Sequence, residues 1–355
     1  MTTPGIRLGG RVVDADSDPY VIAEIGVNHG GSLELAKRLV ELAREGGADA
    51  AKFQTYKAET LASRHSPAYW DTTKEPTLSQ FELFKKYDAF GADEYRALAE
   101  HCARVGIDFV STPFDDDAVD LLAPLVPFFK VASADLTNTP LLRRVAGTGK
   151  PVVLSVGAST TEEIDQALST LGKAGASDVA LLHCILNYPT SDENANLRMI
   201  GDLAARYPQC VPGYSDHTVP KDGLPSLVAA WLLGAVILEK HFTHDTSLQG
   251  NDHYHAMTSE HLRGFRLEVA RIRPLLGSRR KHPLASEEIA RTNARRSIVI
   301  TRDVPAGHPL SEADITYKRP GTGISPLSWD DVIGRTTRRA LAADDVLQWS
   351  DLDEA

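Results

Sequence analysis

Two histidines are placed so that they could share a metal ion. His217 is the last residue of the apolar segment 211–217, and His241 lies near the end of the next apolar segment, 236–243. We expect these two segments to be neighbouring strands. Two neutral imidazoles on one divalent ion leave several coordination positions open for water or substrate, as a Lewis acid requires. We therefore predict a metal site here, better suited to Mn, Co, Fe or Zn than to calcium. The alternative is that each histidine is a hydrogen-bonded core residue.

Two lysines, Lys52 and Lys130, lie at comparable positions of two other segments. The whole chain carries a net charge of −10, so two ammonium groups brought together within it indicate a local anion site rather than a basic field. Hydroxyl groups can add hydrogen bonds to phosphate and carboxylate oxygens. The candidates are Ser133, Ser155 and Ser215.

Two other interpretations of the lysines remain open. A buried lysine can form a Schiff base with a carbonyl substrate, as in aldolases. Alternatively, the lysines only form ion pairs, Lys52 with Glu24 or Lys240 with Glu239.

Further carboxylates and histidines follow the same segments. Glu24 and Asp135 stand where they can orient hydroxyl groups, move protons or neutralise a lysine. After the last segment, Asp252 is followed closely by His253 and His255. This last pattern is weak, and a polar loop explains it equally well.

These side chains lie at the ends of eight short apolar segments, so the fold must bring the ends of all eight segments together. Each segment is rich in Val, Ile, Leu, Phe and Ala, as strands buried on both faces must be, and helical patterns follow. We predict an α/β fold, a (β/α)8 TIM barrel, with the active site at the carboxyl ends of its strands. The segments are 21–28, 49–54, 108–115, 128–135, 151–157, 179–188, 211–217 and 236–243. Polar residues at these ends include Glu24, Lys52, Gln54, Thr112, Lys130, Ser133, Asp135, Ser155, Tyr188, Ser215, His217 and His241.

Local signals mark helices and one long loop. Residues 32–45 read as a helix closed by two glycines, and Thr160 with Glu163 forms a capping box that opens another. The connection 56–92 is unusually long and carries aromatic residues among many charges. Such a loop is either a lid or a surface that packs on a partner.

The sequence changes character after a last barrel helix, predicted over residues 259–276. A strand-like run at 297–301 and a glycine-rich loop at 318–324 predict a small, loop-rich domain. We place the domains at 1–282 and 283–355. The second is marginal in size, so we expect it to pack against something.

Composition restricts the partners and the compartment. A length of 355 residues fits a barrel of about 250 residues plus a small module. The acidic net charge argues against nucleic acid as a partner. Cys102, Cys184 and Cys210 form no CxxC pair, which fits reduced structural thiols. The first residues suggest neither a signal peptide nor a membrane span, so we expect a cytoplasmic protein with no membrane partner.

Taken in order, the motifs at the segment ends resemble those of the sialic acid synthase family. They are AEIGVNH at 23–29, KFQ at 52–54, STPFD at 111–115, KVAS at 130–133, GYSDHT at 213–218 and EKHFT at 239–243. The KRPGTG run at 318–323 is similar to the loop of the antifreeze-like (SAF) domain of these synthases. The resemblance therefore covers nearly the whole chain and implies a C-terminal SAF domain.

The resemblance implies a reaction. Synthases of this family condense phosphoenolpyruvate with an N-acetylated aldose, such as N-acetylmannosamine or a diacetamido hexose, to give a 2-keto-3-deoxy sugar acid and phosphate. It implies that His217 and His241 hold a divalent metal, usually Mn²⁺, with Mg²⁺ or Co²⁺ as alternatives. The residues implied to cradle phosphoenolpyruvate are Lys52, Lys130, Ser133, Ser155, Tyr188 and Ser215, with Thr112 as a further substrate contact. Those implied to position the sugar and a metal-bound water are Glu24, Gln54, Asp135 and Asp252.

The resemblance also implies a domain-swapped homodimer, in which the small domain of one chain caps the barrel of the other. Arg319 would then reach the partner's sugar. The alternative is a small domain that only stabilises the dimer.

Two departures from the family pattern bear on substrate binding. Ile185 and Leu186 stand where the family has Thr and then Asn or Ser, and Asn187 is shifted by one residue, which on a strand reverses its direction. The usual Gly-Pro-Asp-His reads GNDH at 250–253, which bears on the choice of aldose.

Two alternative functions remain open. One is a lysine-dependent aldolase acting on pyruvate, and the other is a non-catalytic sugar-phosphate-binding protein.

Overall fold

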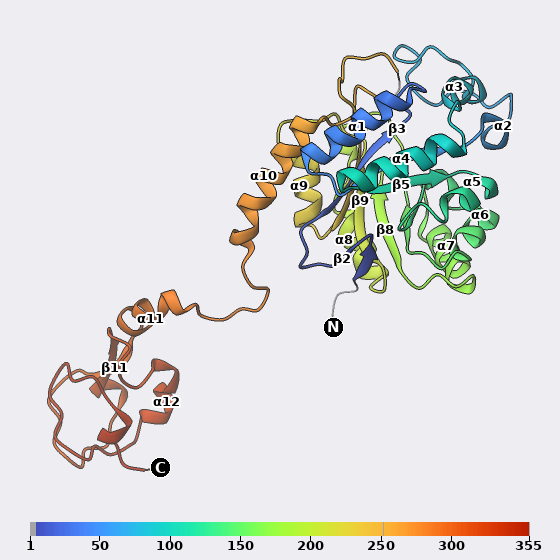
Figure 1. Ribbon diagram of the computed structural model, residues 1–355. Helices are drawn as coiled ribbons and strands as arrows, with labels where there is room; N and C mark the ends of the chain where they lie inside the picture. The colour runs from blue at the N-terminus through green and yellow to red at the C-terminus, as the bar shows by residue number, and fades with distance from the viewer. Residues whose placement is uncertain (1–4, 251, 355) are drawn as a thin grey trace. The chain divides into compact units, whose positions relative to one another are not determined.

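Eight parallel strands form the sheet of the larger part of the molecule. In the computed structural model, which describes residues 5–250 and 252–354, their hydrogen-bonded order is β5-β4-β3-β10-β9-β8-β7-β6. The two end strands β5 and β6 pack beside each other, so the sheet curls into a nearly closed barrel (Figure 1). The strands are β3 (Tyr20–Gly26), β4 (Ala50–Thr55), β5 (Asp108–Pro113), β6 (Phe129–Val131), β7 (Val152–Ser155), β8 (Val179–Cys184), β9 (Val211–Asp216) and β10 (Ile237–His241). This confirms the predicted (β/α)8 barrel.

A helix follows every barrel strand and covers its outer face. The barrel helices are α1 (Leu33–Gly46), α4 (Ala92–Val105), α5 (Asp116–Leu122), α6 (Thr139–Ala146), α7 (Thr161–Lys173), α8 (Met199–Arg206), α9 (Pro225–Leu232) and α10 (Ser259–Leu276). The predicted caps are present: the Ser32 side chain accepts a hydrogen bond from the Leu35 amide at the start of α1, and Thr160 and Glu163 form the capping box of α7. Helix ends set by local hydrogen bonds are therefore well predicted.

The strands end earlier than their apolar segments. β6 stops at Val131, and residues Ser133–Asp135 turn into a short 3-10 helix. β8 stops at Cys184, although its segment was predicted to run to residue 188. The polar residues after these strands leave the ladder and turn over the mouth of the barrel.

A hairpin closes the opposite end of the barrel. Strands β1 (Ile6–Leu8) and β2 (Arg11–Val13) pair in antiparallel fashion. Ile6, Leu8 and Val13 are buried in one cluster with side chains of the lower barrel interior. The sequence analysis did not predict this hairpin, because three-residue strands are too short for a hydrophobic period to show.

The chain divides into two compact units, the first ending at Leu275 and the second beginning at Leu276. The second unit contains α11 (Glu288–Ala294), the antiparallel pair β11 (Ser297–Ile300) and β12 (Ile315–Lys318), and α12 (Trp329–Val332). Its own apolar core includes Ile298, Ile300 and Leu347. The division lies at the end of α10, and the domain boundary at 282/283 stays a prediction.

The long connection after β4 holds two short helices, α2 (Ala58–Leu61) and α3 (Gln80–Tyr87).

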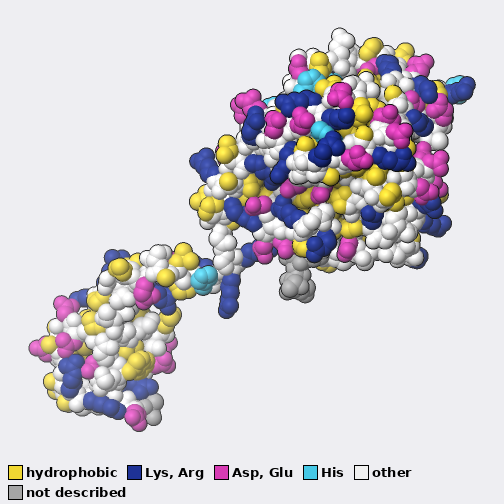
Figure 2. Space-filling model, in the orientation of Figure 1, with side chains coloured by type: hydrophobic (Ala, Val, Ile, Leu, Met, Phe, Trp, Pro, Cys, Tyr) yellow, Lys and Arg dark blue, Asp and Glu magenta, His cyan; other side chains and the backbone are white. Residues whose placement is uncertain are grey.

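On the visible face of the barrel unit, positive and negative side chains are interspersed (Figure 2). Among the described residues, no helix has the length and apolar character needed to cross a membrane.

Candidate active site

Strand register brings the chemically capable side chains together. His241 of β10 lies opposite Glu24 of β3, and Glu24 lies opposite Lys52 of β4. On the other side of β10, Glu239 lies opposite Ser215 of β9. Because alternate residues of a strand face the same side, Glu239 and His241 both point into the barrel.

One cavity at the carboxyl end is lined by most of the residues predicted from the sequence. They are Glu24, Lys52, Gln54, Thr112, Lys130, Ser133, Asp135, Ser155, Tyr188, Ser215, His217 and His241. Asp252 lines an adjoining pocket that shares Gln54, Tyr188 and His241 with this cavity. Arg319 belongs to the second unit. The structure thus gathers the predicted barrel residues, whose individual roles stay predictions.

Buried ion pairs form the floor of the cavity. Lys52 Nζ lies 2.6 Å from Glu24 Oε2 and donates to Thr112 Oγ1 at 3.1 Å. Lys130 Nζ lies 3.7 Å from Glu239 Oε2. All of these side chains are nearly or fully buried, so the predicted pair of Lys52 with Glu24 is present.

Further hydrogen bonds orient the two carboxylates. Gln54 donates to Glu24 Oε1 at 2.8 Å, and Ser215 donates to Glu239 Oε1 at 2.9 Å. Ser155 Oγ is buried and has no hydrogen-bond partner among the described residues. A buried hydroxyl without a described partner, in a cavity that two ammonium groups also line, indicates a place for a ligand acceptor.

Burial and charge shift the pKa values of these groups differently. Burial raises the pKa of Glu24, whereas at Glu239 the two lysines outweigh burial and lower the pKa. At Lys52, the two carboxylates outweigh burial and raise the pKa. Burial lowers the pKa of Lys130 in spite of Glu239. Because burial outweighs Glu239 at Lys130, a further anion in the cavity would favour the charged form of this lysine.

Lys240 has a different place from the one expected. Its Nζ lies 2.9 Å from Asp216 Oδ2 and donates to the Thr218 carbonyl at 2.6 Å. It does not line the cavity. The alternative in which Lys240 pairs with Glu239 was wrong, because strand alternation sends adjacent residues to opposite faces of the sheet.

The two predicted metal ligands face each other across the cavity. The ring centres of His217 and His241 are 5.4 Å apart. His217 Nδ1 lies 3.0 Å from the carbonyl oxygen of Ile185. A carbonyl only accepts, so Nδ1 carries the proton and Nε2 keeps its lone pair. Burial lowers the pKa of both histidines, which keeps the imidazoles neutral.

A third imidazole joins this pair. His255 is fully buried, and its ring centre lies 4.8 Å from that of His241. The potential ligand atoms of His241, Asp252 and His255 all lie within 4.8 Å of one another. The sequence analysis left open whether this loop belongs to the site, and the structure places His255 beside His241.

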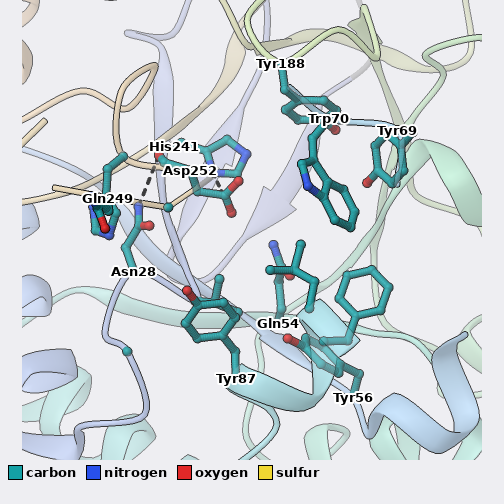
Figure 3. Close-up of a pocket in the computed structure, with 16 residues that line it drawn as sticks. Asn28, Gln54, Tyr56, Tyr69, Trp70, Tyr87, Tyr188, His241, Gln249 and Asp252 are labelled. Carbon is teal, nitrogen blue, oxygen red and sulfur yellow. Dashed lines mark hydrogen bonds and ion pairs between the residues drawn. The ribbon is translucent and has the colours of Figure 1, made fainter. Parts of the chain in front are cut away.

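Aromatic side chains from the long loop wall the adjoining pocket. Tyr56, Tyr69, Trp70, Phe84 and Tyr87 line it together with Asn28, Tyr188 and Gly250. Figure 3 shows His241, Asp252 and Asn28 on one side of this pocket and Trp70, Tyr69 and Tyr188 on another. The loop 56–92 therefore contributes directly to the pocket.

The residues after β8 that depart from the family pattern differ in whether they line the cavity. Leu186 lines the cavity in this region, whereas Asn187 is not among its lining residues. The Asn187 carbonyl accepts a hydrogen bond from Thr190 Oγ1 at 2.9 Å. An apolar side chain thus stands where the family resemblance implies a polar contact.

The sequence analysis missed two features of the site and left a third open. Glu239 was considered as a partner of Lys240 and not as a site residue, although its position two residues before His241 could have shown that both face inward. The burial of His255 depends on a loop that folds back over the barrel, which no local pattern signals. The aromatic residues of the connection 56–92 were visible in the sequence, but whether they form a lid or pack on a partner was left open.

A glycine-rich loop presents Arg319 in the second unit. Arg319 is exposed, and Ser297 Oγ donates to the Pro320 carbonyl at 2.7 Å and accepts from the Gly323 amide at 2.8 Å. A Cβ atom on Gly321 would lie 2.8 Å from the Cβ atom of Arg295. The loop therefore has one hydroxyl at its centre and no room for a side chain at Gly321.

The fold and the cavity define a barrel enzyme with a buried cationic site flanked by imidazoles. A family model described as the NeuB family matches residues 39–281, and one described as the SAF domain matches residues 295–353. The first match spans more than half of the chain. The chain belongs to the NeuB family of sialic-acid-type synthases and ends in a SAF domain.

Relatives and solved structures agree. The chain is 37% identical over 341 residues to the N,N'-diacetyllegionaminic acid synthase of Legionella pneumophila, covering 94% of each chain. It is 33% identical to the N-acetylneuraminate-9-phosphate synthase of Homo sapiens, covering 95% of this chain and 94% of that one. The crystal structure of an N-acetylneuraminic acid synthetase from Leptospira borgpetersenii, in complex with citrate, has a TM-score of 0.71 and 34% identity, over 81% of this chain and 95% of that chain. The sialic-acid-type resemblance and the classification as an enzyme are confirmed.

Proposed function

We propose that this enzyme condenses phosphoenolpyruvate with an aldose, N-acylated in the manner of N-acetylmannosamine, to give a 2-keto-3-deoxy sugar acid and phosphate. The observation that carries the proposal is Lys130, a buried ammonium group that lies 3.7 Å from its carboxylate partner Glu239. It lies in the same cavity as Lys52 and the unpaired Ser155 hydroxyl. A ligand with both phosphate and carboxylate groups would satisfy all three.

The lysine floor and the hydroxyls form the proposed phosphoenolpyruvate cradle. Lys52 and Lys130 bind the charged groups of the substrate, and the hydroxyls donate to its oxygens. Tyr188 closes the cradle on the side of His217, with ring centres 4.3 Å apart. The proposed hydroxyl donors are Thr112, Ser133, Ser155 and Ser215.

The histidines fit a divalent metal. A metal–nitrogen bond of about 2.1 Å places each ring centre about 3.2 Å from the ion, so two rings on one ion have centres up to about 6.4 Å apart. The separation of 5.4 Å between His217 and His241 meets this condition. Enzymes of this family are generally metal-dependent, and we propose Mn²⁺ here, with Mg²⁺ or Co²⁺ as alternatives. When bound, the metal polarises the aldehyde of the open-chain sugar.

The proposed reaction balances without a Schiff base. C3 of phosphoenolpyruvate bonds to the aldehyde carbon of the sugar, water adds at C2, and the C–O bond to phosphate breaks. Glu24, oriented by Gln54, is placed to hold or move a proton at the sugar hydroxyl or the attacking water. Asp135 and Asp252 orient the sugar from the two sides of the mouth.

The aromatic wall of the adjoining pocket is the proposed acceptor subsite. Tyr69 and Trp70 form an edge-to-face pair with ring centres 5.4 Å apart. Aromatic faces bind the apolar surface of a sugar ring and the methyl of an acyl group. A largely aromatic pocket beside the histidines therefore supports an N-acylated acceptor.

The first experiment measures phosphate release from phosphoenolpyruvate with Mn²⁺ across N-acetylmannosamine, mannose and diacetamido hexoses, with mass spectrometry of the products. Release that depends on one sugar supports the proposal and names the acceptor. Binding of phosphoenolpyruvate without release points to an acceptor outside the panel. Failure to bind phosphoenolpyruvate contradicts the proposal.

We further propose a cytoplasmic, domain-swapped homodimer in which Arg319 reaches the sugar in the partner's barrel. The exposed position of Arg319 on its fixed loop supports this arrangement. The three buried free thiols support the compartment. Mixing an Arg319→Ala chain with a His217→Ala chain tests the swap. A swapped dimer regains activity, because one intact barrel then meets one intact Arg319, whereas a dimer that uses its own Arg319 regains none.

A lysine-dependent pyruvate aldolase remains a second candidate because burial lowers the pKa of Lys130, a property that Schiff-base lysines share. Borohydride added with pyruvate distinguishes the two. Reduction of a pyruvate adduct onto Lys130 would favour the aldolase, and an unmodified protein would favour the synthase.

A further inference from the structure

His255 is a buried histidine in the loop after β10. Both of its ring nitrogens are buried and unpaired among the residues that the structure describes, and the same holds for Nδ1 of His241. Leaving a buried polar atom unpaired is unfavourable, because the atom loses its hydrogen bonds to water and gains none in return. An ion bound to one nitrogen of each of these two adjoining rings would remove part of this cost.

The position of His255 is fixed by its neighbours in the chain. Tyr254 Oη donates to the Tyr188 carbonyl at 2.7 Å. On the other side, the Met257 amide donates to the His241 carbonyl at 2.7 Å, and the Thr243 amide donates back to the Met257 carbonyl at 2.9 Å. The loop is therefore fastened directly to the end of β10, and the imidazole of His255 is held against His241.

The ring geometry fits a shared ion. The ring centre of His255 lies 4.8 Å from that of His241 and 6.1 Å from that of His217. Both separations lie within the limit of about 6.4 Å for two imidazoles on one ion. Asp252, three residues earlier, brings an oxygen to within 3.6 Å of His241 Nδ1.

We infer that His255 is a third protein ligand of the divalent metal, so that three imidazoles rather than two bind the ion, with Asp252 beside them. This inference rests on the proposed metal dependence of the enzyme. It assigns to the loop after β10 a role in holding the ion as well as in contacting the sugar. A third imidazole occupies one of the coordination positions that a two-histidine site leaves to water or substrate.

The test is a titration of the full-length, metal-stripped protein with Mn²⁺ alone, following the electron paramagnetic resonance signal of the free ion. His255→Ala should weaken Mn²⁺ binding by about 10–100-fold. His253→Ala is the matched control, because His253 lies in the same loop but bonds Thr243 Oγ1 at 2.8 Å, and it should retain the wild-type affinity. Equal affinities of wild type and His255→Ala would overturn the inference.

A second measurement needs no variant. Pulsed electron paramagnetic resonance of the Mn²⁺-loaded wild type should detect three directly bound imidazole nitrogens. Two nitrogens, with tight binding, would overturn the role of His255 and leave the two-histidine proposal intact. A wild-type protein that binds no Mn²⁺ would overturn both.

Discussion

The two ends of the barrel interior differ completely, although the same strands build both. At the closed end, the inward side chains include Ile22, Ala50, Val153, Leu182 and Ile237, in one apolar cluster with the hairpin β1–β2. Two residues further along the same strands, about 7 Å away, the inward residues are Glu24, Lys52, Ser155, Cys184 and Glu239. One step of the strand period thus separates a packed core from a charged cavity.

This difference shows how the barrel separates stability from chemistry. The side chains of the apolar layer are buried, and so are Ile6, Leu8 and Val13 of the hairpin, which need no partner from outside. The upper layer buries two lysines, two glutamates and three imidazoles, and within the described residues Nδ1 of His241 and both ring nitrogens of His255 have no hydrogen-bond partner. Burying such groups costs stability, which the lower layer must offset. Substitutions at the two ends should therefore have opposite kinds of effect.

The largest effect is expected at the charged end. His217→Ala should reduce phosphate release by at least about 10³-fold, because the Lewis acid contributes several kcal/mol to lowering the barrier, and should reduce bound Mn²⁺. The melting temperature of the metal-free protein should change little. His101→Ala is the control, since this histidine lies on α4 beside Glu41, away from the cavity. Full turnover in a metal-free His217→Ala protein would contradict the assignment.

The reverse result is expected at the apolar end. Leu182→Ala should lower the free energy of unfolding by about 3 kcal/mol, because it leaves a cavity in the packed layer. The affinity of the folded protein for phosphoenolpyruvate should not change. Chemical denaturation and a binding titration measure the two quantities. Leu232→Ala, at a half-exposed position on α9, should stay within about 0.5 kcal/mol of wild type. A large loss of binding in Leu182→Ala would mean that the two layers are not independent.

At the mouth of the barrel, the aromatic wall should contribute to binding of the sugar and the charged floor to binding of phosphoenolpyruvate. Trp70→Ala should raise the KM for the sugar about tenfold and leave the Kd for phosphoenolpyruvate unchanged, because Trp70 lines only the adjoining pocket. Leu78→Ala, exposed in the same loop, should change neither. An equal loss for both substrates would show that the two pockets act as one.

A smaller effect is expected in the second unit, where, in contrast to the cavity, a buried carboxylate has hydrogen-bond donors for its oxygen atoms. Hydrogen bonds from Ser311, His308 and Arg302 outweigh burial and hold the pKa of Asp314 well below its usual value. A depressed pKa contributes stability that is present above about pH 4 and is lost as the pH falls toward the folded-state value. Asp314→Asn should cost about 1 kcal/mol at pH 7, and its deficit should shrink on acidification. Hydrogen exchange of β11 and β12 in the full chain measures this, and a deficit independent of pH would contradict it.

The sequence predicted the parts of the molecule that depend on local chemistry. Helix starts at Ser32 and Thr160 were predicted because their side chains cap amides three residues away. The inward positions of Lys52, His217 and His241 were predicted because strand ends in a parallel barrel share one rim.

The parts that were missed depend on contacts distant in sequence. The burial of His255 follows from the pairing of Met257 with His241 and Thr243. The hairpin closes the barrel only because its three short apolar positions meet the interior. The partner considered for Lys240, Glu239, was wrong. The two-residue period of a strand already excluded this pair, because adjacent residues face opposite sides of the sheet.

The Arg319 loop has a consequence for natural variation. Ser297 holds both sides of the loop through one oxygen atom, and Gly321 has no room for a Cβ atom. Neither residue needs to touch a substrate, yet a methyl group gained at Gly321 or an oxygen lost at Ser297 would displace the arginine. Selection on Arg319 should therefore extend to these two positions, and among homologues all three should change together or not at all.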